Sequence, residues 1–301
     1  MNSGGAGTHA TVASAPPWIA DYAELTKPRV TALILMSTLV GFYLGSPAEI
    51  NFPLLFHTLL GTALVAGGTA ALNQFWEREP DGKMLRTKDR PLPAGRMEPW
   101  KALSFGLVFS VAGILYLITA VSFLTALLAS LTLAAYLFVY TPLKKRTPLC
   151  TLVGAFPGAI PPLIGYVGAS GDFTLGSGIL YLILFLWQFP HFLSIAWLYR
   201  EDYARAGIVM LPVVEPDGKA TGRQILVYCA MLLPASLLPS LVGEMGWIYF
   251  GGAFVLSAIF LHYGIRAATA RTKVQARRLL QASVVYLPLV YGLMMVDKMI
   301  R

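Results

Sequence analysis

Three side chains with oxygen ligands recur at four-residue intervals in the first third of the chain. They are Asn73, Glu77 and Asp81. On a helix each step of four residues advances about 400°, so these side chains stay near one face. The residue before a proline disfavours helical backbone, so Pro80 predicts that the helix ends at Glu79, with Asp81 on the loop just beyond. Carboxylate and amide oxygens in this arrangement suit Mg²⁺, which binds a few such ligands together with substrate phosphates and water.

Two arginines follow these ligands in the same loop. The guanidinium groups of Arg86 and Arg90 match phosphate oxygens in a bidentate way. Acidic and basic side chains in one short loop therefore indicate a metal-bridged diphosphate site. The alternative is a solvated charged loop in which these groups only pair with one another. Spacing alone leaves the two interpretations equally open.

A histidine stands inside an otherwise apolar segment further along the chain. His191 directly follows Pro190 in the stretch WQFPHFLSIAWL. An ionisable residue at membrane depth indicates a functional site, because its burial in lipid is costly. The imidazole could ligate haem iron, act as a base, or form a hydrogen bond with a neighbouring helix. His191 is therefore a catalytic candidate, with a packing role as the alternative.

A second acidic cluster closes the same apolar segment. It consists of Tyr199, Glu201, Asp202 and Tyr203. Because Glu201 and Asp202 are adjacent, both cannot face the interior of a helical bundle. We predict that Asp202 is the residue that faces inward.

The composition predicts the elements that must position these residues. Hydrophobic residues make up 56% of the 301 residues and charged residues only 13%, whereas soluble domains carry about 25% charge. Apolar runs of about 20 residues cross a bilayer as helices, since lipid offers backbone polar groups no other partners. The fold class expected is all-α, a polytopic membrane helical bundle of nine transmembrane helices in one domain over residues 25–301. The expected spans are about 28–46, 52–74, 101–120, 121–140, 150–169, 178–198, 224–243, 246–265 and 280–297.

Positive charge alternates between successive loops. All but two of the 23 Lys and Arg residues precede the first span or follow an even-numbered span, and the exceptions are Lys298 and Arg301. By the positive-inside rule, the N-terminus and the even-numbered loops are cytoplasmic and the C-terminus is outside. Lys27, Lys273 and Arg277 are interpreted as orienting cations. The net charge of +8 thus reflects orientation and not nucleic-acid binding, and both acidic clusters should share one cytoplasmic cavity.

Residues 1–24 are predicted to form a disordered cytoplasmic tail. The segment from Met1 to Pro17 is rich in Gly, Ser, Ala and Thr, and the first cation of the chain is Lys27. It lacks the charged start of a signal peptide and the arginines of a mitochondrial transit peptide, so we expect a bacterial inner membrane protein. The chain has two cysteines, Cys150 and Cys229, which indicate neither a disulfide framework nor a metal site.

Several stretches of the sequence resemble a known family. The Asn73–Glu77–Asp81 series followed by MLRTKDRPLPAGR is similar to the first motif of the UbiA-type intramembrane prenyltransferases. Within that superfamily the chain most resembles the haem O synthase branch, which farnesylates protohaem. Quinone-type relatives place aspartates where this chain has Gln74 and Glu77. The supporting stretches are LTKPRV at Leu25–Val30, YTPLKKRTP at Tyr140–Pro148, GAFPGAIPPLIGY at Gly154–Tyr166, and the PHF, YREDYARAG and MLP segments after Trp187.

The resemblance implies a reaction and a set of residue roles. The farnesyl group of farnesyl diphosphate would be transferred to a vinyl group of protohaem IX (haem B), and water would complete the product, haem O, as diphosphate leaves. A haem A synthase or a terminal oxidase assembly is the implied protein partner. The implied Mg²⁺ ligands are Asn73, Glu77 and Asp81, the implied diphosphate ligands are Arg86, Arg90, Lys144, Lys145 and Tyr199, and His191 and Asp202 complete the catalytic set.

Two other functions are alternatives to this one. A polyprenyltransferase acting on an aromatic quinone precursor is the nearer alternative, and Glu77 and His191 argue against it. A transporter would also carry charged residues in a membrane cavity, usually within inverted repeats that contain broken helices. No repeated motif relates the two halves of this chain, and its charge gathers on one face. This distribution favours a one-sided active site.

Overall fold

The computed structural model describes residues 17–47 and 49–301, and these residues fold into a helical bundle. Within the described ranges, nine segments are long and apolar enough to cross a membrane, which confirms the predicted number and fold class. The first four are α2 (Pro28–Gly45), α3 (Phe52–Lys83), α4 (Pro99–Ala120), and the combination of α5 (Phe123–Ala134), η1 (Ala135–Tyr140) and α6 (Thr141–Leu143). The others are α7 (Cys150–Gly158) with α8 (Pro161–Ser170), then α9 (Leu175–Leu198), α12 (Lys219–Leu241), α13 (Trp247–Ala270) and α14 (Lys273–Ile300).

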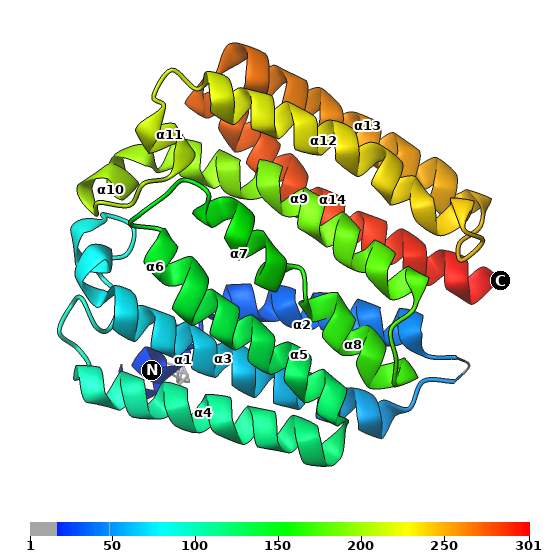
Figure 1. Ribbon diagram of the computed structural model, residues 1–301, viewed down its shortest axis with the longest axis horizontal. Coiled ribbons are helices and arrows are strands. Elements are labelled where there is room, and N and C mark those ends of the chain that lie inside the picture. The colour runs from blue at the N-terminus through cyan, green and yellow to red at the C-terminus, as the bar shows by residue number, and fades with distance from the viewer. Residues whose placement is uncertain (1–16, 48) are drawn as a thin grey trace, which may run out of the picture.

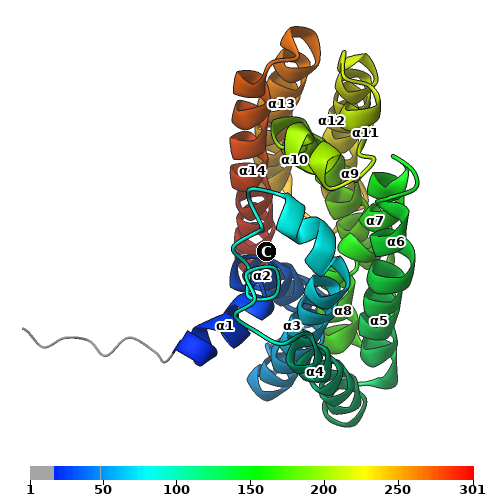
Figure 2. The same cartoon turned by 90° about the vertical axis from the view of Figure 1, so that its left-hand side faces the viewer.

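The helices form two groups that lie side by side (Figures 1 and 2). One group joins α3, α4, α5 and α8 around a core that includes Val65, Leu117 and Ile164. The other joins α9, α12, α13 and α14 around a larger core that includes Leu232 and Leu279. In lipid such cores are stabilised by close packing of side chains and not by the expulsion of water.

Close backbone contact joins α2 to α8 of the first group. A methyl group on Gly165 would collide with the carbonyl oxygen of Thr38, and one on Gly41 would collide with the carbonyl oxygen of Pro162. Small residues at such positions allow two helices to approach closely within a membrane. Part of the GAFPGAIPPLIGY stretch is therefore explained by helix packing.

Two irregularities interrupt the spans beside this packed region. In the fourth span, η1 is a π-helical turn, and the Thr141 hydroxyl donates to the carbonyl of Tyr136, five residues earlier, at 2.8 Å. In the fifth span, the chain breaks at Ala159 and Ile160 before two consecutive prolines, which have no N–H to continue the helix. Single π-turns are frequent at functional sites.

The structure corrects the predicted end of the second span. Helix α3 continues through Pro80 to Lys83, so Asp81 lies in its last turn and not on a loop. An internal proline costs a helix about 3 kcal/mol. The extra turn is held by polar contacts, since the Thr87 hydroxyl donates to the Asp81 carbonyl at 2.8 Å and Arg90 binds the Asp81 carboxylate.

The structure also places part of the expected disordered tail in a helix. Helix α1 covers Pro17–Leu25, whereas residues 1–16 lie outside the described residues. Leu25 is fully buried against α3 and the loop after it, and Arg96 forms ion pairs with Asp21 and Glu24, each at 2.8 Å. The exposed Trp18 suits a helix that lies in the membrane interface.

The loops sort to two ends of the bundle. In Figure 1 the N-terminal helix lies at the same end as the loops after α3, α6, α9 and α13, and the C-terminus lies at the other end. This is the arrangement that the alternating cations require.

The topology can be tested with single cysteines in a background that lacks Cys150 and Cys229. We expect an impermeant thiol reagent to label Asp172→Cys in intact cells and to label Arg271→Cys only after permeabilisation. Both positions are exposed, and both native cysteines are buried. Labelling of position 271 in intact cells would contradict the orientation.

Candidate functional site

The final turns of α3 bring the three predicted metal ligands onto one face. Asn73 is 1% exposed and Asp81 is 2% exposed, and the side chain of Glu77 is 13% exposed. Asn73 is held further by its amide nitrogen, which donates to the Thr141 hydroxyl at 3.2 Å. The π-turn of η1 therefore fixes the amide from the neighbouring span, and the group is a buried site and not a solvated loop.

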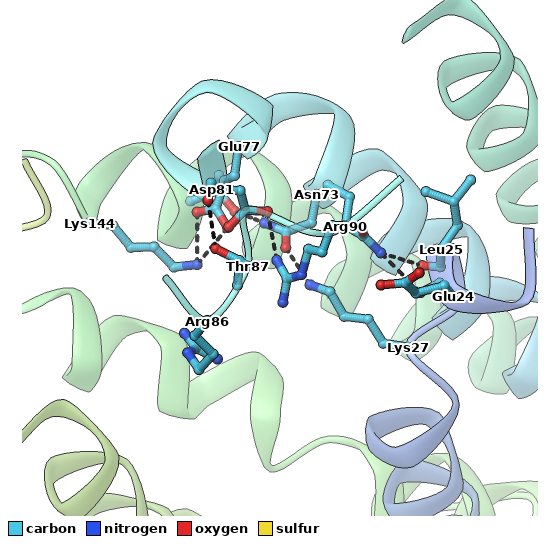
Figure 3. A network of polar contacts seen from close by, with 12 residues as sticks. Glu24, Leu25, Lys27, Asn73, Glu77, Asp81, Arg86, Thr87, Arg90 and Lys144 are labelled. Atoms are coloured by element: carbon cyan, nitrogen blue, oxygen red, sulfur yellow. Dashed lines mark hydrogen bonds and ion pairs between the residues drawn. The ribbon is translucent and has the colours of Figure 1, made fainter. Parts of the chain in front are cut away.

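Each of these three side chains is paired with a cation from a different element (Figure 3). The ammonium of Lys27, between α1 and α2, lies 2.7 Å from Asn73 Oδ1. Lys144, just after α6, lies 2.8 Å from Glu77 Oε1, and Arg90, in the loop after α3, lies 2.6 Å from Asp81 Oδ2. Such charges are costly to bury unless they are paired, and Glu77 and Asp81 each have a cationic partner. Lys27 meets a neutral amide, so the site carries an excess of positive charge.

The cations of the site crowd one another. Burial, followed by the positive charge of Arg90, lowers the pKa of Lys27 to about 7. The ring of Tyr140 faces the ammonium of Lys144 at 4.5 Å, which partly offsets its burial. An anion bound among these groups would favour their charged forms. The arrangement is thus suited to a polyanion such as diphosphate.

The two acidic clusters meet, as predicted from topology. The Asp202 carboxylate accepts a hydrogen bond from the backbone N–H of Leu85 at 3.4 Å and pairs with Arg205. Asp202 is buried in the first turn of α10 (Arg200–Arg205), whereas Glu201 is exposed, which confirms the predicted choice between them. In the other direction, the guanidinium of Arg86 lies 5.2 Å from the ring of Tyr199. The loop after α3 therefore contacts the second acidic cluster.

The contact between this loop and Asp202 predicts that substitutions of Asp202 and Glu201 will affect substrate affinity differently. Asp202→Asn should lower the affinity for the diphosphate substrate by about tenfold or more, because the loop that carries Arg86 and Arg90 loses a charged anchor. The matched control, Glu201→Gln, removes exposed ion pairs with Lys273 and Arg200 and should change the affinity less than twofold, since surface ion pairs contribute little. Equal effects of the two substitutions in a substrate-binding assay would argue against the anchoring role.

Lys145 lies at the rim of the site. It is exposed, and it lines a small cavity beside the Glu77–Lys144 pair. The indole of Trp76 borders the same cavity and packs edge-on against Phe138, with 6.1 Å between the ring centroids. The cavity is thus lined by charged side chains and by an aromatic ring.

His191 lies deeper, on α9. Its Nδ1 is 2.8 Å from the hydroxyl of Ser283 on α14, and its ring stacks on Trp187 at 4.7 Å between centroids. Trp187 in turn donates to the carbonyl of Ser283 at 3.0 Å. The hydrogen bond to a neighbouring helix that a packing role requires is present. The same bond fixes the ring, and Nε2 is the nitrogen that remains for a ligand within the described part of the chain.

Two contributors to the site were missed by the sequence interpretation. The charge pattern predicts an orienting role for Lys27, whereas the structure shows that it contacts Asn73. Gln74 holds the end of α1 because its amide donates to the carbonyls of Glu24 and Leu25. The LTKPRV stretch was the available signal for Lys27.

The donor set fits Mg²⁺. Two carboxylates and one amide oxygen on successive turns match the oxygen ligands that this ion prefers, and the nearby cations supply partners for the phosphates that complete its shell. Among the described residues, no three His, Cys, Asp or Glu side chains gather as a metal cluster, so the amide of Asn73 is needed to complete the set.

Known proteins share this sequence and this fold. The sequence profile of the UbiA prenyltransferase family matches residues 34–287. A Solibacter usitatus protein named protoheme IX farnesyltransferase is 54% identical over 287 residues, covering 92% of this chain and 98% of its own. An Aquifex aeolicus protein of the same name is 41% identical over 280 residues, covering 93% and 95% respectively.

Solved structures show the same arrangement of helices at low sequence identity. A structure of digeranylgeranylglyceryl phosphate synthase has a TM-score of 0.80 at 16% identity and covers 94% of this chain and 99% of its own. A UbiA homologue from Archaeoglobus fulgidus, bound to GPP and Mg²⁺, has a TM-score of 0.62 at 15% identity and covers 91% and 99% respectively.

Proposed function

The chain belongs to the UbiA prenyltransferase family, and on that premise we propose that it transfers the farnesyl group of farnesyl diphosphate to a vinyl group of protohaem IX (haem B). The C1–O bond of farnesyl diphosphate breaks and diphosphate leaves, while C1 bonds to the vinyl group. Water adds to the resulting carbocation and loses a proton, which gives the hydroxyl of haem O. The observation that carries the proposal is the 54% identity, along nearly the whole chain, to a relative named for this reaction.

The charged face of α3 is assigned to the leaving group. Asn73, Glu77 and Asp81 would hold Mg²⁺, which when bound neutralises charge on the departing diphosphate. Arg90 and Lys144 already lie within 3 Å of these carboxylates, so they can exchange a carboxylate oxygen for a diphosphate oxygen. Arg86, Lys145 and Tyr199 form the exposed rim that admits the diphosphate, and Asp202 positions the loop that carries Arg86.

The membrane side of the site is assigned to the farnesyl chain. Heterolysis leaves an allylic cation that water would capture, so the chain must lie in an apolar setting. The indole of Trp76 borders the cavity beside Glu77. An aromatic face stabilises a neighbouring cation. We therefore assign this role to Trp76.

The haem substrate is assigned to the deeper part of the bundle, against His191. The enzyme is placed in the bacterial inner membrane, with its N-terminus in the cytoplasm and its C-terminus outside. Haem O released there would pass to a haem A synthase or to a terminal oxidase assembly.

The reaction can be tested directly with purified protein. Detergent-solubilised enzyme incubated with haem B, farnesyl diphosphate and Mg²⁺ should yield a haem product with the mass of haem O. Prenylation of a phenolic acid such as 4-hydroxybenzoate, with no change to haem B, would instead assign the chain to the quinone branch.

A further inference from the structure

Lys27 occupies an unfavourable backbone conformation. It ends the turn after α1 with φ 49° and ψ 65°, in the left-handed region that a residue with a Cβ rarely adopts. Helices ordinarily place glycine at this position, where it costs nothing. A strained residue persists only where its surroundings hold it, and such residues gather at functional sites.

The surroundings hold Lys27 from both sides. Gln74 donates to the carbonyls of Glu24 and Leu25, at 3.2 and 3.0 Å, just before the turn. After it, the Thr31 hydroxyl donates to the carbonyl of Thr26 at 2.7 Å. These contacts aim the side chain at α3, where its ammonium meets Asn73 Oδ1.

This contact places a cation on an atom that the metal requires. Asn73 Oδ1 accepts from Lys27 at 2.7 Å, and the same oxygen is the third Mg²⁺ ligand of the proposed site. Two cations on one neutral oxygen repel each other strongly in a buried setting. Lys27 would therefore leave Asn73 Oδ1 if that oxygen held the metal, and a bound diphosphate would offer its ammonium a new anionic partner.

We propose that Lys27 is a positioning residue with two partners: it occupies Asn73 Oδ1 in the metal-free protein and binds the diphosphate when the metal and substrate are present. This inference rests on the proposed function. It assigns to α1 and its Gln74 anchor a part in substrate binding. It also gives Lys27 a different role from Arg90 and Lys144, because the partners of those two cations in the free protein are carboxylates.

Two binding measurements test the proposal without turnover. Mn²⁺ binding, followed by electron paramagnetic resonance, reports on the ligand set alone, and binding of the thio analogue of farnesyl diphosphate with Mg²⁺ reports on the substrate. Lys27→Met should bind Mn²⁺ several-fold more tightly and the analogue about tenfold or more weakly, the effect of one charged hydrogen bond. Lys27→Gly should do the same while relieving the backbone, so it replaces the Met variant if that protein folds poorly.

A matched control distinguishes the ammonium from the backbone. Arg271 is the other residue with a Cβ at positive φ among those described, and it lies in the loop after α13. Arg271→Gly should leave both affinities unchanged. Unaltered Mn²⁺ and analogue binding in both Lys27 variants would overturn the inference while the proposed function stands. A wild-type protein that binds no analogue with Mg²⁺ would overturn the proposed function itself.

Discussion

Replacing Asp81 with alanine should abolish haem O formation while the protein still accumulates in the membrane. The carboxylate is 2% exposed, it pairs with Arg90 at 2.6 Å, and it belongs to the set that would hold the metal. Its loss removes a metal ligand and leaves a guanidinium without its partner. Loss of one charged contact to a departing group costs about 10²–10³ in kcat, and loss of a metal ligand costs at least as much. Haem O produced per mole of enzyme, measured by mass, is the readout.

Two further variants show whether the loss of activity comes from the Asp81 carboxylate. Asp81→Asn keeps the size of the side chain but not its charge, and it should be nearly as inactive. Glu79→Ala, two residues away and exposed, should keep activity within about twofold, as most surface substitutions do. Full turnover by Asp81→Ala, or by the native enzyme in EDTA, would remove the metal from the proposed mechanism.

Replacing His191 with alanine should weaken haem binding and shift the haem absorption spectrum, with little change in affinity for farnesyl diphosphate. Eight residues separate His191 from Tyr199 at the mouth, which is about 12 Å along a helix. The diphosphate must stay near the charged mouth, so the deeper imidazole is placed for the larger, flatter substrate. Neutral imidazole is a common axial ligand of haem iron, and Ser283 already holds Nδ1 at 2.8 Å.

The chain contains a matched control for this experiment. His57 on α3 also bonds to a neighbouring helix, with 2.6 Å between its Nδ1 and the Tyr116 hydroxyl, but it lies near the opposite end of the bundle. His57→Ala should leave the haem spectrum unchanged. Lost activity of His191→Ala with a native haem spectrum and affinity would point to a base in place of a ligand. Unchanged activity would show that the contact with Ser283 is packing.

The membrane architecture was predictable because hydropathy and charge act over whole segments. Each span is a long apolar run, and each loop that carries cations marks one side of the membrane. Errors of a few residues in the span boundaries therefore do not alter the predicted number of nine spans, which the described residues confirm. Helix geometry predicted that Glu201 and Asp202 could not both face inward, and the structure buries Asp202. Asn73, Glu77 and Asp81 were found for the same reason, since their spacing lies within a single helix.

The features that the sequence did not predict depend on contacts between distant parts of the chain. Lys27 and Asn73 are 46 residues apart, and Glu77 and Lys144 are 67 apart, so no local pattern connects them. The end of α3 was misplaced because the preference of a residue before proline was outweighed by the contacts of Asp81 with Thr87 and Arg90. The helical part of the tail was missed because Leu25 and Arg96 stabilise it only in the folded protein.

The unusual length of α3 determines how the enzyme can meet an amphiphile. Its 32 residues extend about 48 Å, whereas the hydrocarbon of a bilayer is about 30 Å thick. About 20 residues from Phe52 therefore suffice to cross, and the turns with Asn73, Glu77 and Asp81 rise into the headgroup layer. A prenyl diphosphate in the leaflet on that side of the membrane already holds its charged end at that depth and its tail below. Substrate binding then requires only lateral diffusion within one leaflet, and the diphosphate does not have to cross the hydrocarbon core of the bilayer.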